Sequence, residues 1–229
     1  MKVTYLQHSG FVVELTQHVL VFDYWKGTLP EFDKEKVVLV FVSHAHEDHF
    51  NPEIFSWAAK YPKIHFFLSN DIKIKPHPIL SLVGPDQKGK AEDFTVETIG
   101  STDQGVAFIV NIEGKSIFHA GDLNWWTWGD QDTMEEYLEM TANYLAEINK
   151  IEGRHFDLAF MVLDPRLNDR YGWGLERFLQ SVDCNQVIPM HLWEKYETID
   201  RFMEDPAYEK FADRIIKYQK PGELIILPD

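Results

Sequence analysis

The stretch Ser43-His44-Ala45-His46-Glu47-Asp48-His49 places four potential metal ligands within six residues. It follows the apolar run 37–43, which is typical of a strand covered on both faces in a layered α/β fold. It precedes residues 51–61, which have the pattern of a helix with proline in its first turn. Imidazole and carboxylate groups suit zinc and similar divalent ions. The segment therefore predicts a metal site where a buried strand ends.

The spacing within this segment brings a second cation within reach of the same loop. His44 and His46 are two residues apart in an extended piece, so both can point toward one ion. Asp48 and His49 lie at the turn into the helix and point toward a second ion roughly 3.5–4 Å away, as in two-metal hydrolases. Phe50 stands where a helical zincin motif would have its second histidine, so that pattern is excluded. A solvated histidine-rich loop is the simpler alternative, but three of the ten histidines within six residues make it improbable.

Composition limits the partners that the chain can have. The 229 residues carry 22 basic and 37 acidic side chains, a net charge of −15, with 45% hydrophobic residues. This is ordinary usage for one globular domain spanning residues 1–229. The acidic balance argues against nucleic acid or an anionic membrane as a partner held by bulk electrostatics. A small-molecule substrate remains possible, including an anionic one, because a bound metal or an arginine makes the local electrostatic potential in a pocket positive.

The single cysteine, Cys184, excludes an internal disulfide and any multi-cysteine metal site. No apolar run reaches the length of a signal segment or of the roughly 20 residues that span a membrane. We therefore expect a cytoplasmic protein without a membrane partner. The sequence leaves open whether it forms a homo-oligomer.

Periodicity along the chain predicts strands and helices in the order strands then helix, twice over. This order favours two sheets packed together with helices outside and a site where loops at the sheet edges converge. Residues 70–93 are rich in Pro, Gly and Lys and are expected to be mostly loop and edge structure. The expected strands are 2–6, 10–15, 18–23, 37–43, 64–68, 94–99, 105–112, 116–119, 156–163, 186–189 and 223–227, and the expected helices are 51–61, 132–151 and 175–182.

These motifs together resemble the metallo-β-lactamase superfamily. Residues 43–49 match its HxHxDH signature. Other pieces match in the expected order along the chain: Asp23 before this segment, and the His-Ala-Gly-Asp of 119–122 and the Pro-Met-His of 189–191 after it. With His8-Ser9-Gly10-Phe11, the chain is most similar to the lactonase-like branch that includes L-ascorbate 6-phosphate lactonase. The resemblance implies an α/β (α+β) fold, a four-layer αββα sandwich of two mixed sheets, with metals at one edge between the sheets.

The resemblance also implies roles for individual residues. One metal would be bound by His44 and His46, the other by Asp48, His49 and His191, with Asp122 bridging the two. In such sites a metal-bound hydroxide attacks an acyl or phosphoryl centre. Asp48 would orient that water and return its proton to the leaving group. Other polar side chains would hold the metal ligands in place through hydrogen bonds, and Asp23 is the leading candidate for this role. His119 would either support the ligands in this way or pack in the core. For His8, a supporting role and a purely structural role both remain open.

Ser101 departs from the family pattern, because it stands where a third histidine usually completes the first metal site. Three alternatives follow. The first site could be weak, with one metal held by Asp48, His49, Asp122 and His191. Asp103 could instead supply a ligand and favour manganese. Finally, the site could have lost its metals and become a binding module. The cofactor expectation is therefore one or two Zn²⁺ ions, with Mn²⁺ as an alternative.

Two further loops offer substrate contacts. The run Trp125-Trp126-Thr127-Trp128 either buries its own loop or lines the pocket, and we take Trp125 as the candidate. Arg166 and Arg170 could each hold a carboxylate or a phosphate, or form ion pairs with neighbouring aspartates. The leading hypothesis is a metal-dependent hydrolase of a small ester, lactone or phosphoester. The alternative is a non-hydrolytic relative that binds or senses a metabolite through a degenerate metal site.

Overall fold

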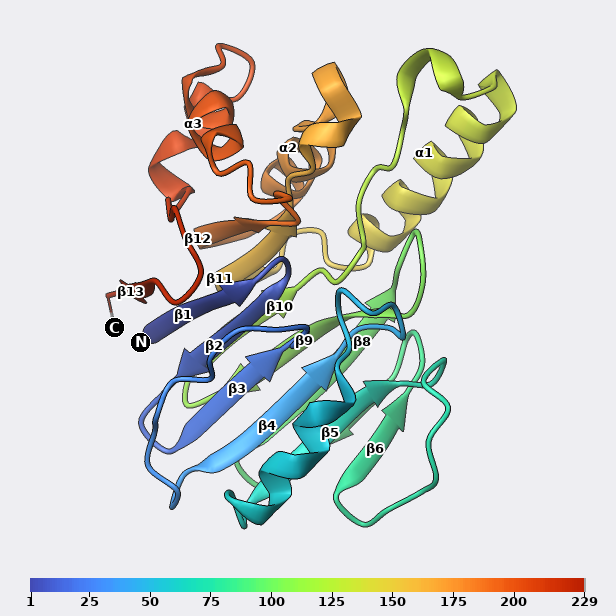
Figure 1. The fold of residues 1–229 in the computed structure, drawn as a ribbon. Helices are drawn as coiled ribbons and strands as arrows, with labels where there is room; N and C mark the ends of the chain where they lie inside the picture. The colour runs from blue at the N-terminus through green and yellow to red at the C-terminus, as the bar shows by residue number, and fades with distance from the viewer. Residues whose placement is uncertain (229) are drawn as a thin grey trace.

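The computed structural model describes residues 1–228 and contains two mixed β-sheets that pack against each other (Figure 1). The first sheet has the strand order β13 (Leu224–Ile226), β1 (Lys2–Gln7), β2 (Gly10–Glu14), β3 (His18–Phe22), β4 (Val37–Val42), β5 (Ile64–Ser69) and β6 (Leu80–Val83). The second has the order β12 (Asp183–Met190), β11 (His155–Val162), β10 (Lys115–His119), β9 (Val106–Ile112), β8 (Phe94–Gly100) and β7 (Lys88–Lys90). The expected pair of mixed sheets is confirmed.

The strand β4 shows how the apolar pattern builds the layers. Val38, Val40 and Val42 belong to the cluster on the outer face of the first sheet, whereas Leu39 and Phe41 face the second sheet. Phe41 contacts Phe108 of β9 with ring centroids 5.2 Å apart. Because both faces are buried, the whole strand is apolar and does not alternate with polar residues.

Helices cover the outer faces of both sheets, which confirms the sandwich. The 3₁₀ helix η1 (Pro52–Ala59) packs on the first sheet through Ile54 and Trp57, while α1 (Met134–Asn149) and α2 (Trp173–Ser181) pack against the second. The remaining helical elements are η2 (Gly129–Gln131), η3 (Pro165–Arg170), α3 (Glu197–Glu204) and η4 (Glu209–Arg214). Within residues 1–228, no helix combines the length and the apolar character needed to cross a membrane.

Most expected elements form with small shifts of their ends. The helix expected at 132–151 begins at Met134, because Thr133 and Glu136 form a capping box there. The expected helix at 51–61 is a 3₁₀ helix, in which Asn51 caps the first turn by accepting the Glu53 N–H at 2.9 Å. Residues 70–93 contain β6 and β7, which are edge strands of the two sheets, as expected.

Parallel pairing brings the site loops to one edge of the sandwich. β3 to β6 run parallel in the first sheet, and β10 to β12 run parallel in the second. The carboxyl ends of parallel strands meet at the same edge of a sheet, so the loops that follow these strands converge there. The loops after β3, β4, β10, β11 and β12 carry Asp23, His44, Asp122, Asp164 and His191.

Two glycines let the backbone close over the histidine loop. Gly105 has a φ of +71°, and a Cβ built on it would overlap the Ser43 carbonyl group and approach the Cβ of His44 to 2.7 Å. Gly121 has a φ of +53°, and its Cβ would lie 2.6 Å from that of Ser43. A larger residue at either position would push residues 43–44 away from the second sheet.

Gly105→Ala therefore tests this close approach, and Gly114→Ala is its matched control. Gly114 has a similar φ of +73° in the β9–β10 turn, but its added Cβ would meet no atom within 4 Å. In both variants the free energy of unfolding should fall by about 1–2 kcal/mol, because alanine must adopt a left-handed backbone conformation. We expect Gly105→Ala to lose about 1–3 kcal/mol more, from overpacking, in urea unfolding. Equal losses would contradict a tight contact at Ser43.

Candidate metal centre

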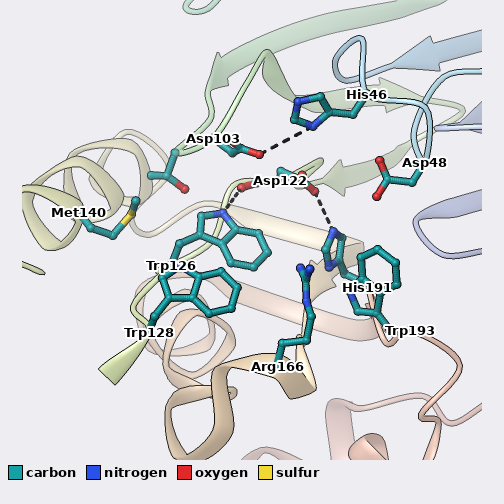
Figure 2. Close-up of a pocket in the computed structure, with 11 residues that line it drawn as sticks. His46, Asp48, Asp103, Asp122, Trp126, Trp128, Met140, Arg166, His191 and Trp193 are labelled. Carbon is teal, nitrogen blue, oxygen red and sulfur yellow. Dashed lines mark hydrogen bonds and ion pairs between the residues drawn. The ribbon is translucent and has the colours of Figure 1, made fainter. Parts of the chain in front are cut away.

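Seven side chains from four separate loops form two adjacent groups of nitrogen and oxygen donors. The first donor group consists of His44, His46 and Asp122, and the second consists of His8, Asp48, His49 and His191. Within each group one ligand atom per residue lies within 4.8 Å of the others. The structure thus brings together all six residues expected to bind metal and adds His8. Figure 2 shows His46, Asp48, Asp122 and His191 arranged around one cavity.

Asp122 connects the two groups through its two carboxylate oxygens. Its Oδ2 lies 3.4 Å from His44 Nε2, and its Oδ1 lies 3.1 Å from His49 Nε2 and 3.5 Å from His191 Nε2. The side chain is almost fully buried directly after β10. This is the position that a carboxylate bridging two cations requires.

The buried charges shift the pKa values of the donors. Burial alone would raise the pKa of Asp122, but His49, His191 and His44 outweigh it and hold that pKa well below its usual range. Burial alone would lower the pKa of His49, yet the Asp122 and Asp23 carboxylates raise it well above 6.5. Burial, followed by the nearby His191 and His49, lowers the pKa of His8 to about 2. Without a metal, the two neighbouring carboxylates therefore favour a proton on His49.

Asp23 supports the histidine loop from beneath, as the sequence suggested. The carboxylate is fully buried after β3 and accepts hydrogen bonds from the Ser43 N–H at 2.7 Å, the Ser43 hydroxyl at 2.6 Å and His49 Nδ1 at 2.8 Å. These contacts direct Nε2 of His49 toward Asp122 and set its ring orientation. His119 is also fully buried: it stacks on Phe22, and its Nε2 contacts the Ser9 carbonyl oxygen at 2.9 Å.

Asp164 supports His191 in the same way, a role that sequence reasoning missed. It is fully buried after β11 and accepts a hydrogen bond from His191 Nδ1 at 2.8 Å. Arg166 donates to the same carboxylate through Nε and Nη2 at 2.6–3.0 Å. Burial alone would raise the pKa of Asp164, but His191 and Arg166 lower it to about 2. The available signal was position, because Asp164 follows β11 just as Asp23 follows β3.

A cavity of about 460 Å³ opens above the donors. Trp126, Trp128 and Trp193 line it with Met140, and Arg166 reaches into it between Trp128 and Trp193 (Figure 2). Its complete lining is His46, Asp48, Thr102, Asp103, Asp122, Trp126, Trp128, Met140, Arg166, His191 and Trp193. The site thus combines charged donors at one end with aromatic walls at the other.

Two of the residues expected to bind substrate do not line this cavity. Trp125 stacks on Tyr144, and its Nε1 donates to Thr141 of α1 at 3.1 Å, so its ring packs the loop against the helix. Arg170 pairs with Asp132 at 3.8 Å and with the Thr127 hydroxyl, and it stabilises the tryptophan loop. The neighbouring Trp126 and Trp128 take the place expected for Trp125, because consecutive residues of an irregular loop point in different directions.

Comparison with known proteins places this arrangement in a family. The sequence profile of the β-lactamase superfamily domain matches residues 2–134, more than half of the chain. The chain belongs to the metallo-β-lactamase superfamily. A UPF0173 metal-dependent hydrolase of Methanosarcina barkeri is 27% identical over 260 aligned positions, covering 99% of both chains.

Solved structures of this superfamily share the fold. The metallo-β-lactamase fold protein YhfI of Bacillus subtilis superposes with a TM-score of 0.61 at 14% identity, covering 98% of both chains. Igni18, described as a metallo hydrolase of Ignicoccus hospitalis, gives a TM-score of 0.60 at 21% identity and covers 98% of this chain and 97% of its own. At these identities the likeness shows the shared fold.

Ser101, where the resemblance led us to expect a third histidine, is not part of the first donor group. The Ser101 hydroxyl accepts the Asp103 N–H at 3.3 Å, and the Asp103 carboxylate lies 3.9 Å from His46 Nδ1. Asp103 lines the cavity next to His46 but lies outside the group of converging ligand atoms. The first donor group therefore offers three ligands and an open side toward the cavity.

The donor set fits a divalent cation. His8 Nε2, His49 Nε2 and Asp122 Oδ1 are buried atoms that have no hydrogen-bond partner of acceptable geometry. Leaving such atoms unpaired costs about 1–3 kcal/mol each, and a metal-ligand bond would satisfy them. Imidazole nitrogen with carboxylate oxygen is the donor chemistry of zinc and related ions in this superfamily fold.

Metal loading of the apoprotein is expected to release a proton from His49. His49 holds a proton at pH 7 because its pKa is raised, whereas His8 and His44 have lowered pKa values and are already neutral. A ligating imidazole must be neutral, so binding of zinc at pH 7 should release at least one proton, and affinity should rise with pH. Calorimetric titration in two buffers of different ionisation enthalpy measures this number. Identical apparent enthalpies in both buffers would contradict it.

Proposed function

We propose that this protein is a metal-dependent hydrolase that cleaves an ester, lactone or phosphoester bond in a small molecule. The observation that carries the proposal is the pair of donor groups beside a cavity with an arginine in its wall, with Asp122 in contact with histidines of both groups. The UPF0173 relative is described as a metal-dependent hydrolase, which supports the same reaction type. The lactonase-like branch remains the resemblance that suggests a lactone or phosphoester.

The cations would be held by His44, His46 and Asp122 on one side and by the second donor group on the other. We propose Zn²⁺, with Mn²⁺ as the alternative if Asp103 contributes an oxygen ligand. Ions of this kind polarise a substrate oxygen and lower the pKa of a coordinated water toward neutrality. The buried Asp23 and Asp164 carboxylates keep His49 and His191 oriented toward the ions.

Asp48 is the candidate for moving the proton. Its side chain is about one-fifth exposed and lines the cavity, whereas the carboxylates of Asp23 and Asp164 are sealed from solvent. A carboxylate in this position can orient the attacking water and return its proton to the leaving group. No other carboxylate among the described residues combines membership of a donor group with that much exposure.

Arg166 and the tryptophans would select the substrate. Two of the guanidinium nitrogens are held by Asp164, and Nη1 has no hydrogen-bond partner among residues 1–228. A carboxylate or phosphate of the substrate can bind that free edge, while the rings of Trp126, Trp128 and Trp193 cover apolar surface. This arrangement favours a small anionic substrate with an apolar part.

The location and partners belong to the same proposal. The net charge of −15 and the single cysteine support a cytoplasmic protein that acts on a small molecule and binds neither nucleic acid nor membrane. Residues 1–229 would act as one domain, with homo-oligomer formation left open by the sequence. The second candidate function is metabolite binding without hydrolysis, and Ser101 at the missing ligand position is the observation that favours it.

Turnover of chromogenic esters, lactones and phosphodiesters, assayed separately with zinc and manganese, tests the reaction type. We expect hydrolysis of at least one class, and we expect Asp48→Ala and His49→Ala to lower kcat by about 10²-fold or more. His155→Asn is the control, because His155 is half exposed and pairs with Asp183 at the opposite end of β11. Saturable ligand binding without turnover under either metal would favour the binding module.

Arg166→Ala tests the anion contact. With an anionic ester we expect KM to rise about 10-fold or more, the cost of one charge-assisted hydrogen bond, while kcat changes little. A neutral ester of the same shape should keep its KM. The anionic ester should also keep its KM with Arg177→Ala, because Arg177 on α2 contacts Asn149 and lies outside the cavity lining. An equal rise in KM for both esters would show that Arg166 shapes the cavity without binding charge.

A further inference from the structure

His8 lies at the turn between β1 and β2, far in sequence from the other donors. Its φ of +56° is in the left-handed region that few non-glycine residues adopt. The surrounding residues over-determine this conformation: the His8 N–H donates to the Tyr5 hydroxyl at 2.9 Å, and its carbonyl accepts the His191 N–H at 3.4 Å. Backbone strain held in place by such contacts is typical of functional positions.

The imidazole of His8 is held in one place by aromatic rings. Its centroid lies 4.7 Å from that of Trp193 and 4.1 Å from that of His191, and Trp25 contacts it edge-on at 6.0 Å. The side chain is only 2% exposed. It therefore cannot swing into solvent to satisfy its nitrogens.

Nε2 of His8 has no hydrogen-bond partner, although it faces the other donors. The nearest acceptor atom is Asp48 Oδ2 at 3.4 Å, whereas a nitrogen donor bonds a carboxylate at about 2.7–2.9 Å. One ring nitrogen of His8 lies within 4.8 Å of ligand atoms of Asp48, His49 and His191. Atoms that converge at this spacing without bonding one another surround a position that a cation can occupy.

We propose that His8 is a protein ligand of the second cation, together with Asp48, His49 and His191. The inference rests on the metal dependence in the proposed function and assigns a residue that the HxHxDH pattern does not contain. With His8, the second cation has four protein ligands in addition to the bridging Asp122, whereas the first has only His44 and His46 in addition to it. Four side chains make a closed site of the kind that binds zinc most tightly, and three leave a position open.

This arrangement offsets the missing ligand at Ser101. The chain lacks a donor in the β8–β9 turn but gains one in the β1–β2 turn, on the other side of the cluster. The cation held through His8 is the deeper one, because three of its four ligands are buried, while His46 of the first group has a side chain that is 42% exposed. The two cations should therefore differ in affinity, with the tight site at His8.

Zinc titration of the metal-free chain against a chromophoric chelator tests this assignment. We expect one tight and one weaker zinc site. His8→Asn should lower the affinity of the tight site by more than roughly 100-fold, because loss of a residue that only supports a ligand lowers metal affinity by roughly 10–100-fold. Asparagine tolerates a positive φ, so this variant keeps the turn. His65→Asn is the matched control, since His65 bonds Ser81 on the first sheet and belongs to neither donor group. An unchanged tight affinity in folded His8→Asn would overturn the inference.

A second measurement needs no variant and stands even if His8→Asn does not fold. In ¹⁵N-labelled wild-type chain loaded with one equivalent of ¹¹³Cd²⁺, the Nε2 resonances of His8, His49 and His191 should each be split by the bonded metal. Splitting at His49 and His191 without splitting at His8 would overturn the inference and leave the proposed hydrolase standing. Neither measurement uses a substrate, so splitting at His8 supports the ligand assignment whatever the turnover assay gives.

Discussion

A histidine buried between two buried carboxylates is the interaction on which the rest of the site depends. His49 contacts Asp23 at 2.8 Å through Nδ1 and Asp122 at 3.1 Å through Nε2, and the three side chains are almost inaccessible to water. Burial of each carboxylate costs several kcal/mol, and one imidazolium balances only one of the two charges. The cluster is left with excess negative charge, and that charge favours divalent cations over the proton on His49.

The layered fold places this cluster at the edge of the two sheets, beside the cavity proposed to bind substrate. Its charged residues follow the carboxyl ends of strands from both sheets, so the buried network of ligands forms at the edge of the sandwich. Gly105 and Gly121 allow the β9 and β10 ends to approach Ser43, whose hydroxyl also donates to Asp23. The apolar layers thus set the distance between the two sheets, and that distance sets the separation of the donors.

The parts of the site that could be predicted from sequence are those encoded locally. Apolar strands of both sheets and the spacing of His44, His46, Asp48 and His49 are properties of short segments, so the elements and their order were predicted closely. His8 and Asp164 could not be assigned, because their roles arise from contacts across more than twenty residues and depend on how the sheets pack. Trp125 and Trp126 show the same limit, since the packing of Trp125 on Tyr144 decides which ring reaches the cavity.

The substrate end and the metal end of the cavity are joined by one carboxylate. Asp164 Oδ2 accepts hydrogen bonds from His191 Nδ1 and from Arg166 Nε, so it orients the histidine and holds the arginine. The Trp193 indole N–H lies 3.3 Å from the same Oδ2 atom. Because both the ligand and the arginine depend on Asp164, the cavity wall cannot be rearranged without disturbing the second donor group. Arg166 can therefore serve two purposes at once. It balances the charge of the buried Asp164 carboxylate, and it still presents one edge of its guanidinium group to the cavity.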